Sequence, residues 1–356
     1  MKFVSKCYII YSDYIDILPA GGGENILKLI RKEIVMKESA RFKLTNKNAT
    51  PEAVHIYDYI GEMYGSKIIS GQQESTWTHD PIYTDSEQYE FDFLLDKTGK
   101  LPAMRGLDYK NDDFEGVNRR AKEWWNRGGI VTICWHTSCD FDKDYPECKE
   151  TEIKDWNKAL TEGTDEYNKL VAGMDKGAKA LKELADQNIP VLWRPFHEMD
   201  GGWFWWGKGG AENFKKLWRL MYDRYTNFWG LNNLIWVCGF SGNGIMDGDA
   251  RTNYAEWYPG DEYVDCVGAD NYSTGSQVEL YNTVRGAVGD AKPIPYHECG
   301  SIPMPADLQK DGAKWAWFMA WHTMYMTDPE VNPEAALKNV YNDEYVITLD
   351  KLPKWK

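Results

Sequence analysis

The sequence of 356 residues has no long hydrophobic run. No stretch approaches the roughly 18 apolar residues that a membrane-spanning helix needs, so we expect no membrane span. The N-terminus begins with basic residues but reaches Ser12 and Asp13 after only a few apolar ones. Because the apolar segment of a signal peptide has about 7–15 residues, no clean export signal is recognisable.

Positive charge is also scarce. The chain carries a formal net charge of −14, which repels phosphate backbones and anionic lipid surfaces. We therefore expect no nucleic-acid partner. Hydrophobic residues make up 43% of the chain, which is enough for a large globular core.

Cysteines are few and show no regular spacing. Their number, seven, is odd, and no pattern indicates a disulfide framework or a zinc site. Cys134, Cys139 and Cys148 are close enough in sequence for one optional disulfide, but we expect most cysteines to be small buried thiols.

Several motifs of cofactor and metal enzymes are missing. The chain has no G-x-G-x-x-G fingerprint and no G-x-S-x-G nucleophile turn. Four histidines follow predicted strands, as in some metal hydrolases: His136, His197, His297 and His322. However, neither an H-E-x-x-H motif nor an H-x-H pair occurs, so we expect no metal and no cofactor.

Aromatic residues, in contrast, are abundant. The chain contains 17 Trp and 22 Tyr, more than a core of this size needs. Flat aromatic faces stack well on the apolar faces of sugar rings, so this composition favours a carbohydrate-binding cleft. The alternative is an aromatic-rich core.

The pattern of apolar residues indicates the fold class. Residues 1–45 contain a Gly21-Gly22-Gly23 break and lack periodicity, so we interpret them as an irregular N-terminal extension. Over residues 46–356, short apolar runs alternate with amphipathic stretches such as 163–187 and 212–228, which predicts repeated βα units. The expected strands are 67–70, 101–107, 130–135, 190–196, 234–239, 263–269, 293–296 and 315–321. Eight units predict an α/β fold, a single (β/α)8 TIM barrel, whereas a doubly wound sheet normally carries a glycine-rich phosphate loop.

Two glutamates follow predicted strands, each beside a histidine: Glu198 comes after His197, and Glu298 comes after His297. Polar residues at the carboxyl ends of barrel strands point into the mouth of the barrel. Two carboxyls facing each other there can hydrolyse a glycosidic bond, one as proton donor and the other as nucleophile or base. Alternatively, each glutamate forms only a structural ion pair, for example with Arg105 or Arg194.

A cluster of indoles follows the fourth predicted strand. Trp203, Trp205 and Trp206 lie within four residues of one another. Loops lie on the surface of a protein, so we interpret these residues as a sugar-stacking platform.

Three more side chains follow other predicted strands. His136 could donate a hydrogen bond to a sugar hydroxyl, although it could equally be a structural residue. Tyr272 could hydrogen-bond the carboxylate of Glu298 and hold it ionised. Trp321 is a natural floor for the sugar at the cleavage point.

Residues 193–207, with the sequence WRPFHEMDGGWFWWG, closely resemble the acid/base segment of glycoside hydrolase family 26, a family best known for β-mannanases. Further matches extend from about residue 51 to 352. They include Met104-Arg-Gly-Leu-Asp108, Trp135-His136, Gly268-Ala-Asp-Asn-Tyr272, His297-Glu298 and Trp321.

The resemblance implies a (β/α)8 barrel and a retaining mechanism, with Glu198 as acid/base and Glu298 as nucleophile. His197 looks like the family's active-centre histidine, and Tyr272 looks like its nucleophile-contacting tyrosine. Residues that look like the lining of the subsite for the attacked sugar are His136, Trp203 and Trp321. Asp200 departs from the pattern, since many relatives have Asn there.

The expected function is therefore endo-acting hydrolysis of β-1,4-mannosidic linkages in mannan, galactomannan or glucomannan. Alternatives are a β-glucanase or β-xylanase on the same scaffold, an exo-acting mannobiohydrolase, and a non-catalytic carbohydrate-binding barrel. The acid-rich stretch 139–155 is the candidate for a loop that blocks one end of the cleft. We expect a monomer. By family resemblance, we expect it to act in an extracellular or periplasmic location.

Overall fold

The computed structural model describes residues 41–76, 86–143, 145–242 and 253–355. One compact unit extends from Phe42 to Lys356. Most of the predicted N-terminal extension, residues 1–40, lies outside the described residues. Phe42 itself is buried, and its ring packs against Tyr57 and Tyr64.

Eight parallel strands form a closed barrel. The strands are β1 (Ile68–Gln73), β2 (Met104–Asp108), β3 (Ile130–Cys134), β4 (Val191–Arg194), β5 (Leu234–Ser241), β6 (Cys266–Asn271), β7 (Tyr296–Cys299) and β8 (Trp317–Ala320). Each strand pairs with the next in sequence, and β1 pairs with both β2 and β8, which closes the barrel. A short strand, β9 (Val346–Ile347), pairs with the beginning of β1. The prediction of a (β/α)8 barrel is confirmed.

Nearly all strand residues are buried, as expected for parallel strands that are covered on both faces. All eight predicted strands exist, but their bounds differ from those observed. The largest error concerns residues 293–296, because the observed strand starts only at Tyr296. Pro293 and Pro295 have no N–H to donate to the ladder. The shift places Glu298 inside β7 rather than beyond its end.

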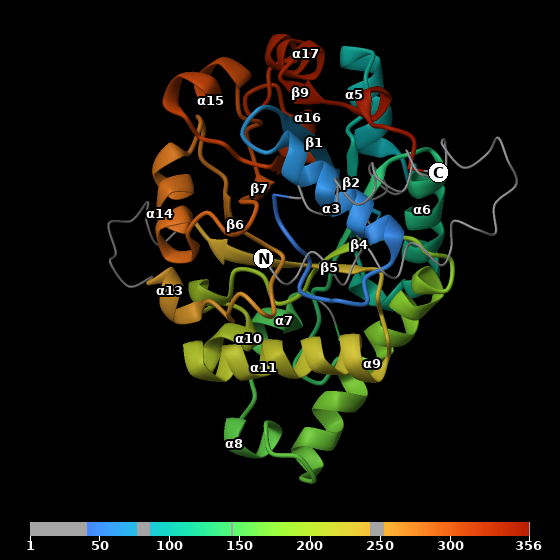
Figure 1. Ribbon diagram of the computed structural model, residues 1–356, viewed down its shortest axis with the longest axis vertical. Helices are drawn as coiled ribbons and strands as arrows, with labels where there is room; N and C mark the ends of the chain where they lie inside the picture. Colours follow the sequence, from blue (N-terminus) through green and yellow to red (C-terminus); the bar gives the residue numbers. More distant parts are fainter. Residues whose placement is uncertain (1–40, 77–85, 144, 243–252, 356) are drawn as a thin grey trace, which may run out of the picture. The chain divides into compact units, whose positions relative to one another are not determined.

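Helices surround the sheet, and their colours run in sequence order around it in Figure 1. The longer helices are α3 (Pro51–Met63), α5 (Tyr89–Thr98), α6 (Phe114–Asn126), α9 (Asp165–Ala185), α11 (Ala211–Asp223), α14 (Val278–Val288), α15 (Pro305–Asp311) and α17 (Glu334–Asn342). Short helices are α7 (Glu147–Glu150), α8 (Trp156–Ala159), α10 (Trp205–Lys208), α13 (Tyr254–Trp257) and α16 (Met324–Thr327). Single turns are η1 (Lys110–Asp112), η2 (Met199–Gly201), η3 (Arg224–Phe228) and η4 (Leu349–Lys351).

Helix α9 illustrates how the sequence specifies these elements. The hydroxyl of Thr164 caps its N-terminus by accepting the N–H of Tyr167 at 3.1 Å. Residues spaced by three or four positions, such as Met174, Ala178 and Leu181, are buried against the barrel. The predicted helix 163–187 is thus confirmed. The predicted helix 212–228 is α11 followed by the wider turn η3.

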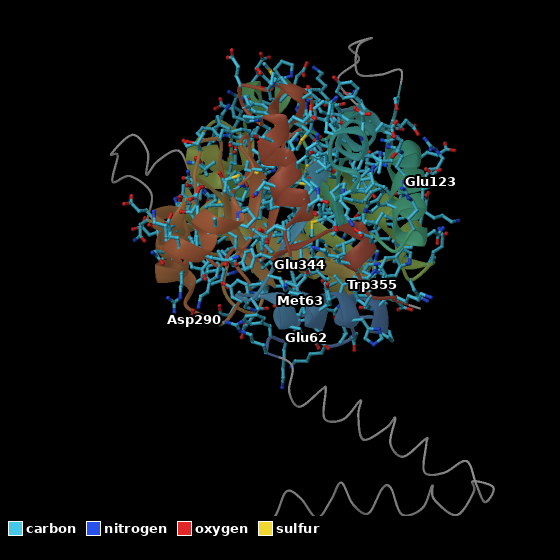
Figure 2. All side chains as sticks on the ribbon, turned by 90° about the horizontal axis from the view of Figure 1, so that it is seen from above. Glu62, Met63, Glu123, Asp290, Glu344 and Trp355 are labelled. Atoms are coloured by element: carbon cyan, nitrogen blue, oxygen red, sulfur yellow. The ribbon has the colours of Figure 1, made fainter. Side chains whose placement is uncertain are left out.

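The amino ends of the strands are covered by α3 and by the C-terminal segment. Tyr57 of α3 donates to the carbonyl of Asp265, just before β6, at 2.7 Å. Trp355 stacks on Trp125 and donates to the carbonyl of Gly128, just before β3, at 2.7 Å. Figure 2 shows Trp355 near the end of α3. The carboxyl ends of the strands are therefore the face on which a site can open.

The aromatic residues fill much of the core. Eight tryptophans of the described residues are fully buried: Trp124, Trp193, Trp205, Trp206, Trp218, Trp236, Trp315 and Trp317. The aromatic surplus is therefore largely explained by packing, and only part of it serves a cleft. The six cysteines in the described ranges are free thiols, so the optional disulfide among Cys134, Cys139 and Cys148 is not formed. Among the described helices, none combines the length and apolar character that crossing a bilayer requires.

Candidate active site

A cleft of about 590 Å³ opens at the carboxyl ends of the strands. Seven of the residues that the sequence singled out for catalysis and substrate binding line it. Its lining consists of Lys110, His136, Tyr145, Lys149, His197, Glu198, Trp203, Phe204, Tyr272, Glu298, Trp321, His322 and Tyr325. Residues from distant parts of the sequence are thus brought together as the barrel geometry predicts.

Glu298 lies within β7 and is held by two hydrogen-bond donors. Arg194 Nη2, at the end of β4, donates to its Oε1 at 2.5 Å, and the Tyr272 hydroxyl donates to its Oε2 at 2.6 Å. The expected hydrogen bond from Tyr272 is therefore present. Of the two arginines considered as ion-pair partners, Arg194 contacts Glu298, whereas Arg105 pairs with the buried Glu74.

A second carboxylate supports this arrangement from behind. Asp270 Oδ2 accepts from Arg194 Nη1 at 3.2 Å, and its Oδ1 lies 2.5 Å from His297 Nδ1. Burial raises the pKa of Glu298 to about 7, and the charge of Asp270 acts in the same direction. Arg194 and Tyr272 oppose this rise because both stabilise the ionised form.

Glu198 lies beyond the end of β4 in a constrained turn. Both Phe196 and Glu198 have φ of 51°, in the left-handed region. Such residues cost of order 1–3 kcal/mol each and persist only where the surroundings hold them. The Glu198 N–H donates to the carbonyl of Gly239 in β5 at 2.7 Å, and the Trp206 indole donates to the carbonyl of His197 at 2.7 Å.

The carboxyl group of Glu198 has a different environment from that of Glu298. Burial raises its pKa well above the usual range, and the charges of Glu298 and Asp270 raise it further. The indole N–H of Trp203 donates to Oε2 at 2.8 Å and lowers the pKa, but it does not offset the rise. Glu198 is therefore the more strongly protonated of the two glutamates. Pairs of carboxyls whose pKa values are pushed apart are typical of an acid and a nucleophile.

The two glutamates face each other across the cleft. One carboxylate oxygen from each of Glu198, Asp270 and Glu298 lies within 4.8 Å of the others. This upper bound for the separation of two carboxylate oxygens is closer to the spacing of about 5–5.5 Å in retaining glycosidases than to the roughly 6.5–9.5 Å of inverting ones.

A hydrogen-bonded chain of two histidines borders the glutamates. His136 Nδ1 lies 2.6 Å from Asp108 Oδ2, and His136 Nε2 lies 3.1 Å from His197 Nε2. One Nε2 donates to the other in the bond between the two rings, and which of them donates depends on the tautomers. His197 Nδ1 is buried and has no hydrogen-bond partner among the described residues. Burial and the charge of Arg194 lower the pKa of His197 well below its usual value, so the ring is neutral.

The interpretation of three neighbouring indoles as one sugar platform is wrong for two of them. Trp205 and Trp206 are fully buried, and both belong to the short helix α10, which packs into the core. Only Trp203 lies at the cleft, where it is partly exposed. The segment is not an ordinary surface loop, because Gly207 lets it approach the backbone of Met199 so closely that a Cβ would lie 2.0 Å from that carbonyl oxygen.

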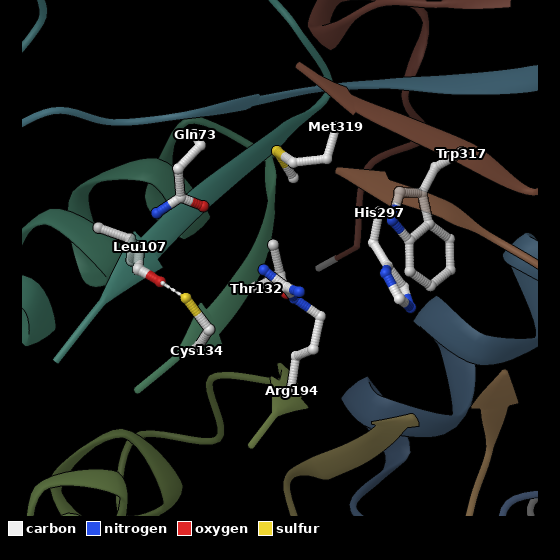
Figure 3. Close-up of a pocket in the computed structure, with 8 residues that line it drawn as sticks. All are labelled: Gln73, Leu107, Thr132, Cys134, Arg194, His297, Trp317 and Met319. Atoms are coloured by element: carbon white, nitrogen blue, oxygen red, sulfur yellow. Dashed lines mark hydrogen bonds between the residues drawn. The ribbon is translucent and has the colours of Figure 1, made fainter. Parts of the chain in front are cut away.

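The barrel interior beneath the glutamates is almost filled. A cavity of about 10 Å³ remains there, roughly the space of one water molecule. Arg194, Gln73 and His297 point toward it from β4, β1 and β7 (Figure 3). Within the described residues, the open cleft is therefore the route by which a substrate can reach Glu198 and Glu298.

Several cleft residues were not identified from the sequence as substrate-binding residues. Tyr145 and Lys149 come from the stretch 139–155, which was considered only as a loop limiting the cleft. Lys110 Nζ lies 4.4 Å and Lys149 Nζ lies 4.9 Å from the ring centre of Tyr145. Tyr325 packs against Tyr272 with ring centres 4.8 Å apart. Tyr145, Lys149 and Tyr325 lie in connections away from the strand ends, so the strand-end pattern could not reveal them. Lys110 lies two residues after β2, as His136 does after β3, so the same pattern could have revealed it.

Two groups of side chains have the ligand types and spacing of a metal site. One consists of Asp108, Cys134 and His136, and the other consists of Glu198, Asp270 and Glu298. In the first group, His136 Nδ1 already binds Asp108. In the second, the guanidinium of Arg194 already supplies a positive charge to two carboxylates. Candidate ligand atoms of both groups therefore already have partners within the protein.

Comparisons with known proteins agree with this geometry. A mannan endo-1,4-beta-mannosidase of Thermothelomyces thermophilus is 35% identical over 339 residues, covering 88% of this chain and 64% of that protein. The chain thus spans less than two thirds of the length of this curated relative. A ruminal GH26 endo-beta-1,4-mannanase has a TM-score of 0.79 and 32% identity, covering 89% of this chain and 72% of that chain.

A second solved structure matches over nearly its whole length. It is a beta-mannanase from a symbiotic protist of the termite Reticulitermes speratus, complexed with gluco-manno-oligosaccharide. The TM-score is 0.76 and the identity 31%, with 88% of this chain and 98% of that chain covered. The model of glycosyl hydrolase family 26 matches residues 45–351. The resemblance found in the sequence is therefore confirmed, and the chain belongs to glycosyl hydrolase family 26.

Proposed function

We propose that this protein is a retaining endo-β-1,4-mannanase in which Glu198 is the acid/base and Glu298 the nucleophile. The observation that carries the proposal is the pair of facing carboxyls with oxygens within 4.8 Å of each other. Retaining glycosidases place their carboxyls about 5–5.5 Å apart, whereas inverting ones need roughly 6.5–9.5 Å. The printed names of the relatives, which are mannanases, support mannan as the substrate.

In the first step, protonated Glu198 donates its proton to the glycosidic oxygen while a carboxylate oxygen of Glu298 bonds to the anomeric carbon. The bond between that carbon and the leaving sugar breaks. In the second step, Glu198 removes a proton from water, whose oxygen attacks the anomeric carbon and releases Glu298. Each glutamate thereby returns to its starting state.

The neighbouring residues suit these steps. Arg194 and Tyr272 stabilise the ionised form of Glu298 before attack. Trp321 and Trp203 provide aromatic surface along the cleft, and the pair His136 and His197 provides hydrogen-bonding groups for sugar hydroxyls. These substrate-binding roles are part of the proposal.

We also propose that the protein acts as a monomer outside the cytoplasm. All the cleft residues named above come from one chain, so no second copy is needed to complete the site. A polysaccharide is too large to cross a membrane unaided, which favours an extracellular or periplasmic location.

A substrate panel tests the sugar and the mode of cleavage. Mannan, galactomannan, glucomannan, mixed-linkage glucan and xylan should be compared, with product lengths resolved over time. We expect mannans to be cleaved to mixed oligosaccharides of several lengths. Release of mannobiose alone from the start would indicate an exo-acting enzyme, and preference for glucan or xylan would reject the assigned sugar. Binding without new reducing ends would identify a non-catalytic barrel.

Azide rescue separates the roles of the two glutamates. With an activated aryl β-mannoside, Glu298→Ala should yield a glycosyl azide of inverted configuration, because azide enters the space of the lost nucleophile. Glu198→Ala should yield the retained azide, because azide attacks the covalent intermediate on the vacated face. The opposite pairing of products would reject the assignment. Glu123→Ala, at an exposed position of α6, is the matched control (Figure 2).

A further inference from the structure

The carboxyl group of Asp200, two residues after Glu198, has an unusual environment. Its Oδ1 accepts the backbone N–H of Ser241, at the end of β5, with a distance of 2.7 Å. Its Oδ2 is buried and has no hydrogen-bond partner among the described residues. A buried carboxylate with one unsatisfied oxygen is costly, so this environment favours the neutral acid.

Asp200 also occupies a mechanically important position. The Glu198 N–H binds the carbonyl of Gly239, and the Asp200 carboxyl binds the N–H of Ser241, two residues further along the same strand. Together they attach the turn after β4 to the end of β5. This is the turn in which Phe196 and Glu198 adopt left-handed backbone conformations and which therefore needs external support.

We propose that Asp200 is a positioning residue that, as a neutral carboxyl, holds the Glu198-bearing turn against β5, and that its ionisation weakens this hold. The inference rests on the proposed role of Glu198 as acid/base. It predicts that two groups, Glu198 and Asp200, must both carry a proton for full activity.

Among the described residues, the charged and titratable groups around Asp200 do not offer an ionised carboxylate a cationic partner. On β6, Asp270 is a second negative charge, which raises the pKa of Asp200. On β5 and α13 lie the thiol of Cys238 and the hydroxyl of Tyr254; burial raises the pKa of each, and the charge of Asp200 raises it further. The Tyr254 hydroxyl donates to the carbonyl of Ser241 at 2.6 Å.

Two further charged side chains extend from the elements packed against this turn. On α10, the ammonium of Lys208 is engaged by the carbonyls of Lys149 and Thr151. On α13, Glu256 accepts from Asn253 at 3.2 Å and would add only negative charge. Ionisation therefore places a new negative charge where the described surroundings do not neutralise it.

The sign of the pH effect follows from this environment. Burial raises the pKa of Asp200 to about 7, although the N–H of Ser241 acts against the rise. The unfolded value is about 3.9, so between about pH 4 and pH 7 the folded protein binds the proton more tightly than the unfolded chain. The stability contributed by this proton is complete below about pH 4 and is lost as the pH rises through 7.

Asp200→Asn and Asp200→Ala test the proposal together. The amide keeps an acceptor oxygen for Ser241 and cannot ionise, so kcat at pH 6 should stay within about twofold of the wild type. The wild type should show an extra fall in kcat as the pH rises through about 7, no larger than the loss in Asp200→Ala, and this step should be missing from the profile of Asp200→Asn. Alanine removes the acceptor, so kcat should fall about tenfold with little change in KM.

Two results would overturn the proposal: an Asp200→Asn variant with the wild-type alkaline limb, or an Asp200→Ala variant with the kcat of the Asn variant. Thermal unfolding provides a readout that does not depend on activity. The melting temperature of Asp200→Asn minus that of the wild type should rise from pH 4.5 to pH 7.5, which would be a gain in relative stability. The exposed Asp186→Asn, at the end of α9, is the control and should show no such gain. If the gain appears but Glu198 proves not to be the acid/base, the proposed function fails while the titration of Asp200 stands.

Discussion

Tyr272→Phe removes one hydrogen bond from the proposed nucleophile and little else. The hydroxyl donates to Glu298 Oε2 at 2.6 Å, and within the described residues the other hydrogen bond to this carboxyl comes from Arg194. The ring of Tyr272 packs against Tyr325, and a phenylalanine ring can keep that contact. The substitution therefore changes the electrostatics of Glu298 more than its packing.

The size of the effect follows from the type of hydrogen bond. A hydrogen bond to a charged group is worth about 1.5–3 kcal/mol, and one pKa unit corresponds to about 1.36 kcal/mol. Because the hydroxyl stabilises the ionised carboxyl, its loss should raise the pKa of Glu298 by about 1–2 units. Starting from a pKa of about 7, the acidic limb should move toward pH 8–9.

The assay is kcat/KM as a function of pH, since this ratio reports groups of the free enzyme. The ratio of the variant's kcat/KM to that of the wild type should be about tenfold or more lower at pH 6 than at high pH, because at pH 6 fewer variant molecules carry the ionised nucleophile. Tyr325→Phe, a matched change in the same cleft, should leave the acidic limb in place. An acidic limb that stays unmoved in Tyr272→Phe, or moves to lower pH, would refute the assignment of Glu298.

Two further substitutions test the electrostatics and the packing of the site. Arg194→Met should lower the free energy of unfolding by about 3–5 kcal/mol, because it leaves the buried Glu298 without its cation. The control Arg119→Met changes an exposed side chain and should lower this free energy by no more than about 1 kcal/mol. Equal midpoints of the two variants in urea unfolding would contradict this expectation. Trp205→Ala should cost about 3–5 kcal/mol because its indole is fully buried, and the partly exposed Trp203→Ala should cost less stability while lowering kcat. If Trp203→Ala proved less stable than Trp205→Ala, the assignment of Trp205 to the core and Trp203 to the cleft would be wrong.

The sequence was sufficient to identify the barrel and its two glutamates. Strand and helix periods are local properties, and the mouth of a barrel collects whatever follows its strands. This rule correctly indicated that Glu198 and Glu298 would meet, although they are one hundred residues apart in the chain. It also correctly brought Tyr272 into contact with Glu298.

The same reasoning failed where local sequence does not determine burial. The local sequence does not distinguish the three neighbouring indoles of Trp203, Trp205 and Trp206. Two of them, Trp205 and Trp206, are core residues because α10 packs back against the barrel. Tyr145 and Lys149 reach the cleft from a long connection whose path depends on packing. A strand-end pattern contains no information about either outcome.

The sequence by itself determined the fold class, the family and the identity of the two glutamates, because these depend on periodicity and on a long specific motif. Only the tertiary structure decided how the glutamates differ. The separation within 4.8 Å, the pairing of Glu298 with Arg194 and the unpartnered oxygen of Asp200 arise from contacts between strands far apart in sequence. Burial and nearby charge set the pKa of each carboxyl, and both exist only once the chain has folded.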